Sequence, residues 1–238
     1  NFAKKLPSFG ELYIHDAFSC SHRKQSSIHK ITKYVDNCFA GPLLKKEIES
    51  INLVIFSKKT PVTCIIGGSK ISSKINVISS LIEKVNNIVI VGAMANNFLI
   101  CNNIKVGKSL VEKNTKEIIQ KINEKARKYK CEILIPSDCM VGTKFKGSSK
   151  IRNLDSIQEN EIILDIGPKT IKSIIKKINE SNTVMWNGPA GYFENENFSK
   201  GTISLAEAIS NNTIKKTLTS IIGGGDTIAA IKKSKNKL

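Results

Sequence analysis

From about Pro61 onward, short and almost continuous apolar runs alternate with longer amphipathic stretches. Runs rich in Ile and Val predict strands that are covered on both faces, and apolar residues three or four apart predict helices. Their alternation predicts a Rossmann-like α/β fold, in which a parallel sheet lies between two layers of helices. The predicted strands lie in "VTCIIGG", "NIVIVGAM", "CEILIPSD", "EIILDIG", "TVMWNGPAGYF" and "LTSIIGGGDT".

The first 38 residues do not follow this alternation. The stretch "GELYIHDAFSCSHRKQSS" predicts one strand and a polar loop, and "AGPLLKKEIESINLVIF" predicts a helix. We therefore expect part of a second domain over residues 1–38, an interdomain helix over 39–57 and the sheet domain over 58–238.

The net charge of +17, from 37 basic and 20 acidic residues, would attract any polyanion. Only three of the basic residues are arginine, the residue best suited to reading phosphates and bases, and the lysines are scattered over predicted solvated helix faces. A drift in composition towards Lys, Asn and Ile explains the charge better than a nucleic-acid groove, although a basic nucleic-acid-binding module stays open as an alternative.

Apolar runs, cysteines and histidines give expectations about membrane association, cellular location and metal binding. No apolar run reaches the roughly 20 residues of a membrane-spanning helix, so we expect no membrane association. The six cysteines are widely spaced and lack a C-x-x-C pair, which indicates buried, reduced thiols and a cytoplasmic protein. The three histidines lack metal-ligand spacing.

Glycine or proline follows nearly every predicted strand, in "IIGGSK", "IVGAMA", "IPSDC", "DIGPKT", "WNGPAG" and "IIGGGDT". Ligands of open parallel sheets bind at the carboxyl ends of the strands. Glycine lets main-chain N–H groups come close to a ligand, and a helix N-terminus attracts anions. Six such exits predict a phosphate-rich ligand.

Two common nucleotide motifs are absent. The "GKS" at Gly107 lacks the glycine five residues earlier that a phosphate-binding P-loop needs, because Asn102 stands there. "GGGDTI" has Ile228 in place of the third glycine of the dinucleotide fingerprint. The sequence therefore favours neither a P-loop enzyme nor a hydride-transfer enzyme.

The charged residues at the strand exits each allow two interpretations. Lys70 and Lys74 are four residues apart, so on a helix they would share a face and point at one anion, or both would be solvated. Asp226 either caps a helix or holds a divalent cation that bridges phosphates. Glu194 is either a surface carboxylate or a partner for a ribose hydroxyl.

Taken together, these segments resemble the phosphoglycerate kinase family. The similarity extends from about residue 9 to about residue 231, in the family's order and at similar spacing. "WNGPAGYFE" followed by "GGGDT" is the most specific part of it. The matching segments are "DAFSCSHR", "AGPLLKKEIE", "IIGGSKISSK", "IVGAMANNFL", "VGKSLVE", "LDIGPKT", "VMWNGPAGYFENENFSKGT" and "IIGGGDT".

The resemblance implies a two-domain enzyme of glycolysis that moves a phosphoryl group reversibly between 1,3-bisphosphoglycerate with ADP and 3-phosphoglycerate with ATP. It implies that Lys74 binds the nucleotide phosphates and that Lys70 stabilises the transferring phosphoryl group. Asn187 would contact the phosphates, and Asp226 would hold Mg²⁺. Three further residues would line the phosphates, namely Gly224, Gly225 and Thr227.

The remaining implied roles concern the two ends of the substrates. Gly92 would lie against the adenine, and Glu194 would bind the ribose. Arg23 would reach the phosphate of 3-phosphoglycerate from residues 1–38, which correspond to the end of the family's N-terminal domain. The resemblance also implies a monomer.

The sequence departs from the family at both ends and inside the base pocket. Segments that the family carries before residue 1 and after residue 238 are absent, so we expect weak binding of MgADP or MgATP and no turnover by this chain alone. An inactive truncated kinase scaffold is therefore a second alternative. His15 stands where asparagine is usual. Ile163 and Ala93 stand where glycine is frequent around the adenine, and the bulkier Ile163 would either narrow the base pocket or only repack it.

Overall fold

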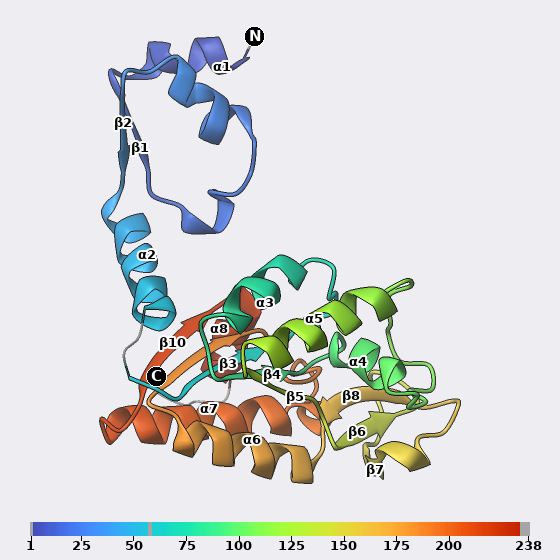
Figure 1. The fold of residues 1–238 in the computed structure, drawn as a ribbon. Coiled ribbons are helices and arrows are strands. Elements are labelled where there is room, and N and C mark those ends of the chain that lie inside the picture. Colours follow the sequence, from blue (N-terminus) through green and yellow to red (C-terminus); the bar gives the residue numbers. More distant parts are fainter. Residues whose placement is uncertain (1, 57–58, 234–238) are drawn as a thin grey trace. The chain divides into compact units, whose positions relative to one another are not determined.

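The chain divides by its internal contacts into two compact units, Asn1–Leu53 and Val54–Leu238 (Figure 1). The computed structural model describes residues 2–56 and 59–233. The division falls inside helix α2, Pro42–Ile55. The three segments expected from the sequence, with borders after residues 38 and 57, stay predictions.

The first unit contains two parallel strands, β1 (Leu12–His15) and β2 (Asn37–Ala40). The sequence predicted one strand here, and β2 is the addition. The carboxylate oxygen Oδ1 of Asp16 accepts a hydrogen bond of 2.7 Å from the main-chain N–H of Leu44, so it joins the end of β1 to the first turn of α2. The other elements are short helical turns at Phe2–Lys5, Leu6–Phe9, Phe18–Cys20, Ser26–Lys30 and Ile31–Lys33.

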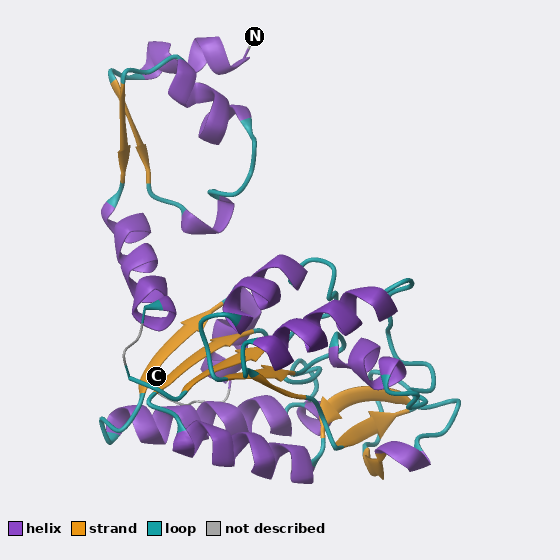
Figure 2. Cartoon of the chain, in the orientation of Figure 1, coloured by secondary structure: helices purple, strands orange, loops and turns teal. Residues whose placement is uncertain are grey.

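A five-stranded sheet with the strand order β10-β9-β3-β4-β5 forms the centre of the second unit, and all its strands are parallel (Figure 2). Its strands are β3 (Val62–Ile66), β4 (Asn87–Ile90), β5 (Glu132–Leu134), β9 (Thr183–Asn187) and β10 (Thr219–Gly223). The sheet is the one that the alternation of the sequence predicted.

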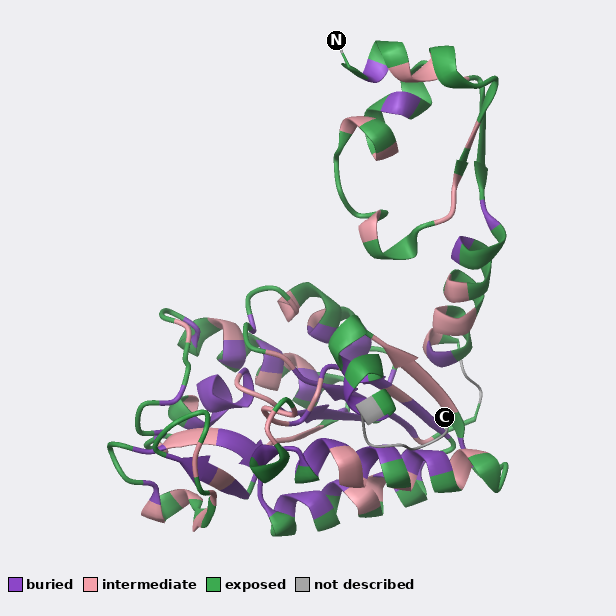
Figure 3. Ribbon diagram, turned by 180° about the vertical axis from the view of Figure 1, so that it is seen from behind, coloured by how far each residue is buried: buried purple, intermediate pink, exposed green. Residues whose placement is uncertain are grey.

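Helices cover both faces of this sheet, which confirms the predicted three-layer α/β fold. The central strands β3, β4 and β9 are wholly or mostly buried, whereas the edge strands β5 and β10 are only half-buried (Figure 3). One face packs against α3 (Ile75–Ile82), α4 (Ala95–Cys101) and α5 (Lys116–Lys128). The other face packs against α6 (Pro168–Glu180), α7 (Lys200–Ile214) and α8 (Gly225–Lys233).

The apolar runs fold as strands because their side chains alternate between two separate cores. In β3, Cys64 and Ile66 belong to the core on the α3 side, and Ile65 between them belongs to the core on the α6 side. All five residues of β3 are buried. Since complete burial of a side chain such as Ile65 contributes about 1.5–3 kcal/mol, a polar residue would be costly on either face.

A second, antiparallel sheet of three strands adjoins the site and was not predicted. Its order is β7-β6-β8, and its strands are β6 (Asp138–Gly142), β7 (Lys150–Asn153) and β8 (Ile162–Ile166). The prediction that "EIILDIG" belongs to the parallel sheet was wrong. An apolar run can form a strand of a parallel or of an antiparallel sheet, and only the tertiary fold determines which strands pair with it.

Two further expectations can be compared with the structure. Within residues 2–56 and 59–233, no helix has the length and apolarity needed to cross a membrane. All six cysteines are free thiols, but only Cys64, Cys131 and Cys139 are buried, and Cys38 is exposed. The expectation of buried cysteines was therefore wrong for Cys20 and Cys38 of the first unit and for Cys101 of the second.

Candidate functional site

Three strand ends lie level with one another at the carboxyl edge of the parallel sheet. Asn187 at the end of β9 is in register with Ile66 of β3 and with Gly223 of β10. The loops that follow therefore meet at one place, where they enclose a cavity of about 240 Å³. Its lining includes the residues predicted on the phosphate side, Lys70, Lys74, Asn187, Gly224, Gly225, Asp226 and Thr227.

Lys74 is the most constrained cation of this cavity. Its Nζ donates to the main-chain oxygen of Gly67 at 2.6 Å and to Oδ1 of Asn187 at 2.6 Å. Burial lowers the pKa of Lys74, and the nearby carboxylate of Asp226 acts in the opposite direction. The ammonium group is thus held at a fixed position between the ends of β3 and β9.

The two lysines do not share a helix face, so that part of the sequence analysis was wrong. Helix α3 begins at Ile75, and Lys70 and Lys74 lie in the loop before it. The main-chain N–H of Lys74 donates to the oxygen of Ile71, which closes a turn. Both lysines nevertheless line the same cavity, because the turn brings them together as a helix would have done.

Absent side chains allow the loops to approach one another closely. A Cβ atom at Gly67 would collide with the main-chain oxygens of Pro189 and Gly188. Gly224 has a φ of +92°, in a region that residues with a side chain rarely adopt. Gly225 has open space where its side chain would be. The lack of a side chain at Gly67 thus allows the loops after β3 and β9 to approach each other, whereas packing does not require glycine at Gly225.

Thr227 joins two of the loops. Its side chain is completely buried, and its Oγ1 accepts a hydrogen bond of 2.7 Å from the main-chain N–H of Gly188. It lines the cavity, but the hydroxyl also ties the first turn of α8 to the loop after β9. This structural contact could not be read from the sequence.

A second and largely apolar pocket of about 450 Å³ adjoins the first. The two share Gly68, Ser69, Pro189 and Asp226 in their linings. The apolar residues around the second pocket come from α4, from β8 and from several loops, and they include Ala93, Leu99, Leu110, Phe145, Ile162 and Ile163. Gly92 and Glu194, predicted on the nucleoside side, line this pocket.

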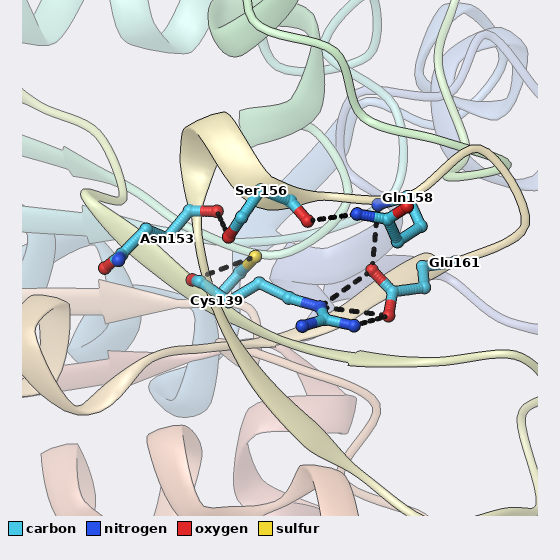
Figure 4. Close-up of polar contacts among 6 residues, drawn as sticks. Cys139, Asn153, Ser156, Gln158 and Glu161 are labelled. Carbon is cyan, nitrogen blue, oxygen red and sulfur yellow. Dashed lines mark hydrogen bonds and ion pairs between the residues drawn. The ribbon is translucent and has the colours of Figure 1, made fainter.

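Glu161, directly before β8, forms an ion pair with Arg152 of β7 (Figure 4). Nη2 of Arg152 lies 2.8 Å from Oε1 of Glu161, a carboxylate that is almost completely buried. Oε2 of Glu161 accepts from the main-chain N–H of Gln158, and the hydrogen bond from Arg152 is the main reason that the pKa of Glu161 is lowered. The sequence did not predict this pair, because Arg152 and Glu161 meet only when the segment between β7 and β8 has folded.

One of the six strand ends that were expected to bind a phosphate-rich ligand cannot bind an anion. The N-terminus of α6 is already occupied by the buried carboxylate of Asp138. Its Oδ1 accepts from the main-chain N–H of Thr170 at 2.8 Å, and its Oδ2 accepts from that of Lys169 at 3.0 Å. The exit "DIGPKT" is therefore a capped helix rather than a phosphate site.

A second buried acid, Asp165, lies beside the apolar pocket. It is 2 % exposed, and burial raises its pKa to about 7. Its Oδ2 accepts a hydrogen bond of 2.7 Å from the main-chain N–H of Gly201, and a Cβ atom at Gly191 would collide with its carboxylate. Asp165 is the single acidic residue in the apolar run "IILDI", and this position could have indicated a buried carboxyl group from the sequence.

Arg23 belongs to the first unit and lines a cavity of about 440 Å³ there. The same cavity is lined by His15, His22, Lys24 and His29, so it is rich in groups that bind anions. His15 is held from both sides, with Nδ1 3.2 Å from the hydroxyl of Tyr13 and Nε2 2.8 Å from Oγ of Ser21.

Comparison with known proteins identifies the family. The sequence model of the phosphoglycerate kinase family matches residues 1–237. This chain belongs to the phosphoglycerate kinase family. A phosphoglycerate kinase of Wolbachia pipientis wMel is 44% identical over 232 residues, which are 97% of this chain and 58% of that protein. A phosphoglycerate kinase of Granulibacter bethesdensis is 40% identical over 233 residues, 97% of this chain and 59% of that protein.

Solved structures of phosphoglycerate kinases agree with the fold. The enzyme of Coxiella burnetii superposes with a TM-score of 0.84 at 35% identity, over 98% of this chain and 59% of that one. The enzyme of Pyrococcus horikoshii OT3 gives 0.79 at 27% identity, over 97% of this chain and 57% of that one. The chain thus spans just under three fifths of these phosphoglycerate kinases. The comparisons support neither a nucleic-acid-binding module nor an inactive scaffold.

Proposed function

We propose that this chain takes part in the phosphoglycerate kinase reaction, the reversible transfer of a phosphoryl group between 1,3-bisphosphoglycerate with ADP and 3-phosphoglycerate with ATP. The observation that carries the proposal is the meeting of Lys70, Lys74, Asn187 and Asp226 around one cavity at the carboxyl edge of the sheet. An apolar pocket adjoins this cavity, so the pair suits a ligand with an anionic tail and an apolar base.

The chemistry asks for position and charge rather than for a covalent intermediate with the protein. Towards ATP, an oxygen of the β-phosphate of ADP attacks the acyl phosphorus, the bond from phosphorus to the acyl oxygen breaks, and 3-phosphoglycerate leaves as a carboxylate. Negative charge is spread over the transferring oxygens. Lysine ammonium groups and main-chain N–H groups that are fixed in advance stabilise that charge without reorganising.

The contacts of Lys74 support its role at the nucleotide phosphates. An ammonium group has three N–H donors, and two of them are used by Gly67 and Asn187 at 2.6 Å. The third is not engaged at short range, since the remaining contact, to the main-chain oxygen of Asn187, is 3.5 Å long. We assign this third donor to a phosphate oxygen and the more exposed Lys70 to the transferring phosphoryl group.

We assign the binding of Mg²⁺ to Asp226. Among the residues that the structure describes, no three His, Cys, Asp or Glu side chains group together as a metal site. A single carboxylate at a phosphate cavity suits Mg²⁺, which keeps several waters and is commonly bound by one or two carboxylates together with substrate phosphates. When bound, Mg²⁺ would neutralise phosphate charge, and Asp226 would fix its position beside Gly224 and Gly225.

The other assignments complete the proposal. Gly92 would face the base and Glu194 the ribose, since both line the apolar pocket. Thr227 would line the phosphates, and Arg23 of the first unit would bind the phosphate of 3-phosphoglycerate. We further propose that the protein is cytoplasmic, in keeping with its free thiols, and that it acts as a monomer.

Thermal unfolding with and without MgADP tests the proposal. At a ligand concentration of one hundred times Kd, binding to the folded state adds about 2.7 kcal/mol, which for a domain of this size raises Tm by about 5–10 °C. Lys74→Ala and Asp226→Ala should each remove most of this rise. Lys172→Ala, which removes an exposed lysine of α6 outside both pockets, should leave it unchanged.

Two results would oppose the proposal. The first is a parent protein whose Tm does not respond to MgADP. The second is an equal loss of the response in Lys172→Ala and Lys74→Ala, which would mean that the response is caused by general positive charge.

A further inference from the structure

Asn96 carries an unused hydrogen-bond acceptor in the wall of the apolar pocket. The residue lies in the first turn of α4, is 1 % exposed and lines the pocket. Its Nδ2 donates to the main-chain oxygen of Leu110 at 3.0 Å. Its Oδ1 has no partner, and among the residues that the structure describes it is the one buried side-chain oxygen or nitrogen in that condition.

The orientation of this amide follows from its neighbour. Turning the amide round would place Oδ1 against the oxygen of Leu110, where two acceptors would face each other. The Nδ2 contact therefore fixes Oδ1 as the group left over. The next residue, Asn97, is equally buried, but its Oδ1 accepts from the main-chain N–H of Glu112 at 2.9 Å and from Oγ1 of Thr115 at 3.3 Å.

A buried acceptor without a partner is unfavourable, and such atoms are rare in folded proteins. The cost is removed when a ligand supplies an N–H group. The neighbouring wall residues Ala93, Leu99 and Ile163 offer apolar side chains that suit the faces of a flat ring. The pocket therefore combines apolar walls with one buried hydrogen-bond acceptor, which can distinguish bases by the polar groups at their edges.

We propose that Oδ1 of Asn96 accepts a hydrogen bond from the 6-amino group of the purine base, which makes Asn96 a specificity-determining residue. This inference rests on the proposed nucleotide-binding function. In inosine diphosphate the 6-position is a carbonyl oxygen, an acceptor, so it would leave Oδ1 of Asn96 unpaired and repel it. A site that hydrogen-bonds a polar group of its ligand rejects the analogue that lacks this group.

The test measures the affinities of MgADP and of the inosine analogue MgIDP by calorimetry for the full chain. We expect the parent to prefer MgADP by about tenfold, the scale of one net hydrogen bond. Asn96→Leu, which has a similar volume and no acceptor, should weaken MgADP binding and bring the ratio of the two Kd values close to one. Asn96→Ser is the second variant, for use if the first folds poorly.

Asn97→Ser is the matched control. It disturbs the contacts to Glu112 and Thr115 and so can weaken both nucleotides, but the ratio of their Kd values should stay that of the parent. A shift of the loop at Leu110 would likewise change both affinities in the same direction, whereas loss of Oδ1 of Asn96 weakens MgADP binding and relieves the repulsion of MgIDP.

Each outcome is decisive. A parent that binds MgADP and MgIDP equally, or an Asn96 variant that keeps the preference of the parent, overturns the assignment of Asn96 while the nucleotide-binding function stands. A parent that binds neither nucleotide overturns the proposed function and this assignment with it.

Discussion

Asp165 should make the folded protein less stable as the pH rises from about 4 to about 7, and Asp165→Asn should abolish this dependence. Its carboxyl group is buried beside Gly191 and Gly201, and burial raises its pKa to about 7 from a usual 3.8. Hydrogen bonds from the main-chain N–H groups of Gly201 and Ile166 favour the charged form but do not offset the burial.

The sign and size follow from proton linkage. Between the two pKa values the folded state keeps the proton that the unfolded state has lost, so the free energy of unfolding falls as the pH rises through this interval. A rise from 3.8 to about 7 corresponds to about 4 kcal/mol, an order-of-magnitude figure for so buried a group. Below the unfolded pKa the group contributes no dependence, and above the folded pKa the loss is complete.

Urea unfolding of the parent and of Asp165→Asn at several pH values between 4 and 8 measures the effect. The variant loses an acceptor for one N–H group, which lowers stability by a similar amount at every pH. Relative to the parent, it should therefore gain stability steadily as the pH rises. Glu83, Glu112 and Glu161 have lowered pKa values and act in the opposite direction at acid pH, but they are present in both proteins and cancel. Parallel stability curves for the two proteins would refute the reasoning.

Two further predictions concern the surroundings of the site. Asp138→Ala removes the buried cap of α6 and should lower the free energy of unfolding by about 2 kcal/mol, which corresponds to a fall in Tm of about 4–8 °C. The increase in Tm on adding MgADP should be the same as in the parent. If the variant kept the Tm of the parent but lost this increase, Asp138 would belong to the ligand site instead. Glu112 accepts from the main-chain N–H and the hydroxyl of Ser72, in the loop of Lys70 and Lys74. Glu112→Gln should therefore weaken MgADP binding several-fold and leave adenosine binding unchanged, as calorimetry can measure; equal weakening of both ligands would contradict a role in placing the lysines.

Local pattern in the sequence was sufficient for the sheet and for most of the cavity. The apolar runs at β3, β4 and β9 can satisfy two buried faces only as strands in the middle of a sheet. Parallel strands share a carboxyl edge, so residues just after them, such as Lys74 and Asp226, were expected to meet. Resemblance to a family then supplied roles that residue type alone left open.

The sequence could not decide pairings between segments that are distant along the chain. Whether "EIILDIG" joins a parallel or an antiparallel ladder depends on which edge is available when the chain has folded. Likewise, Asp138 lies about thirty residues before the helix that it caps, and its carboxylate could have been a ligand for a cation as easily as a cap. Only the approach of α6 settles its role.

The same reason separates the two neighbouring asparagines of α4. In the sequence Asn96 and Asn97 are alike, and both are buried in the fold. The loop at residues 110–115 fills the hydrogen-bonding capacity of Asn97 and leaves Oδ1 of Asn96 unused. Composition and periodicity determine which residues are buried, because burial follows the faces of strands and helices. Whether a buried polar group has a hydrogen-bond partner depends on side chains and main-chain groups that come together only in the tertiary structure.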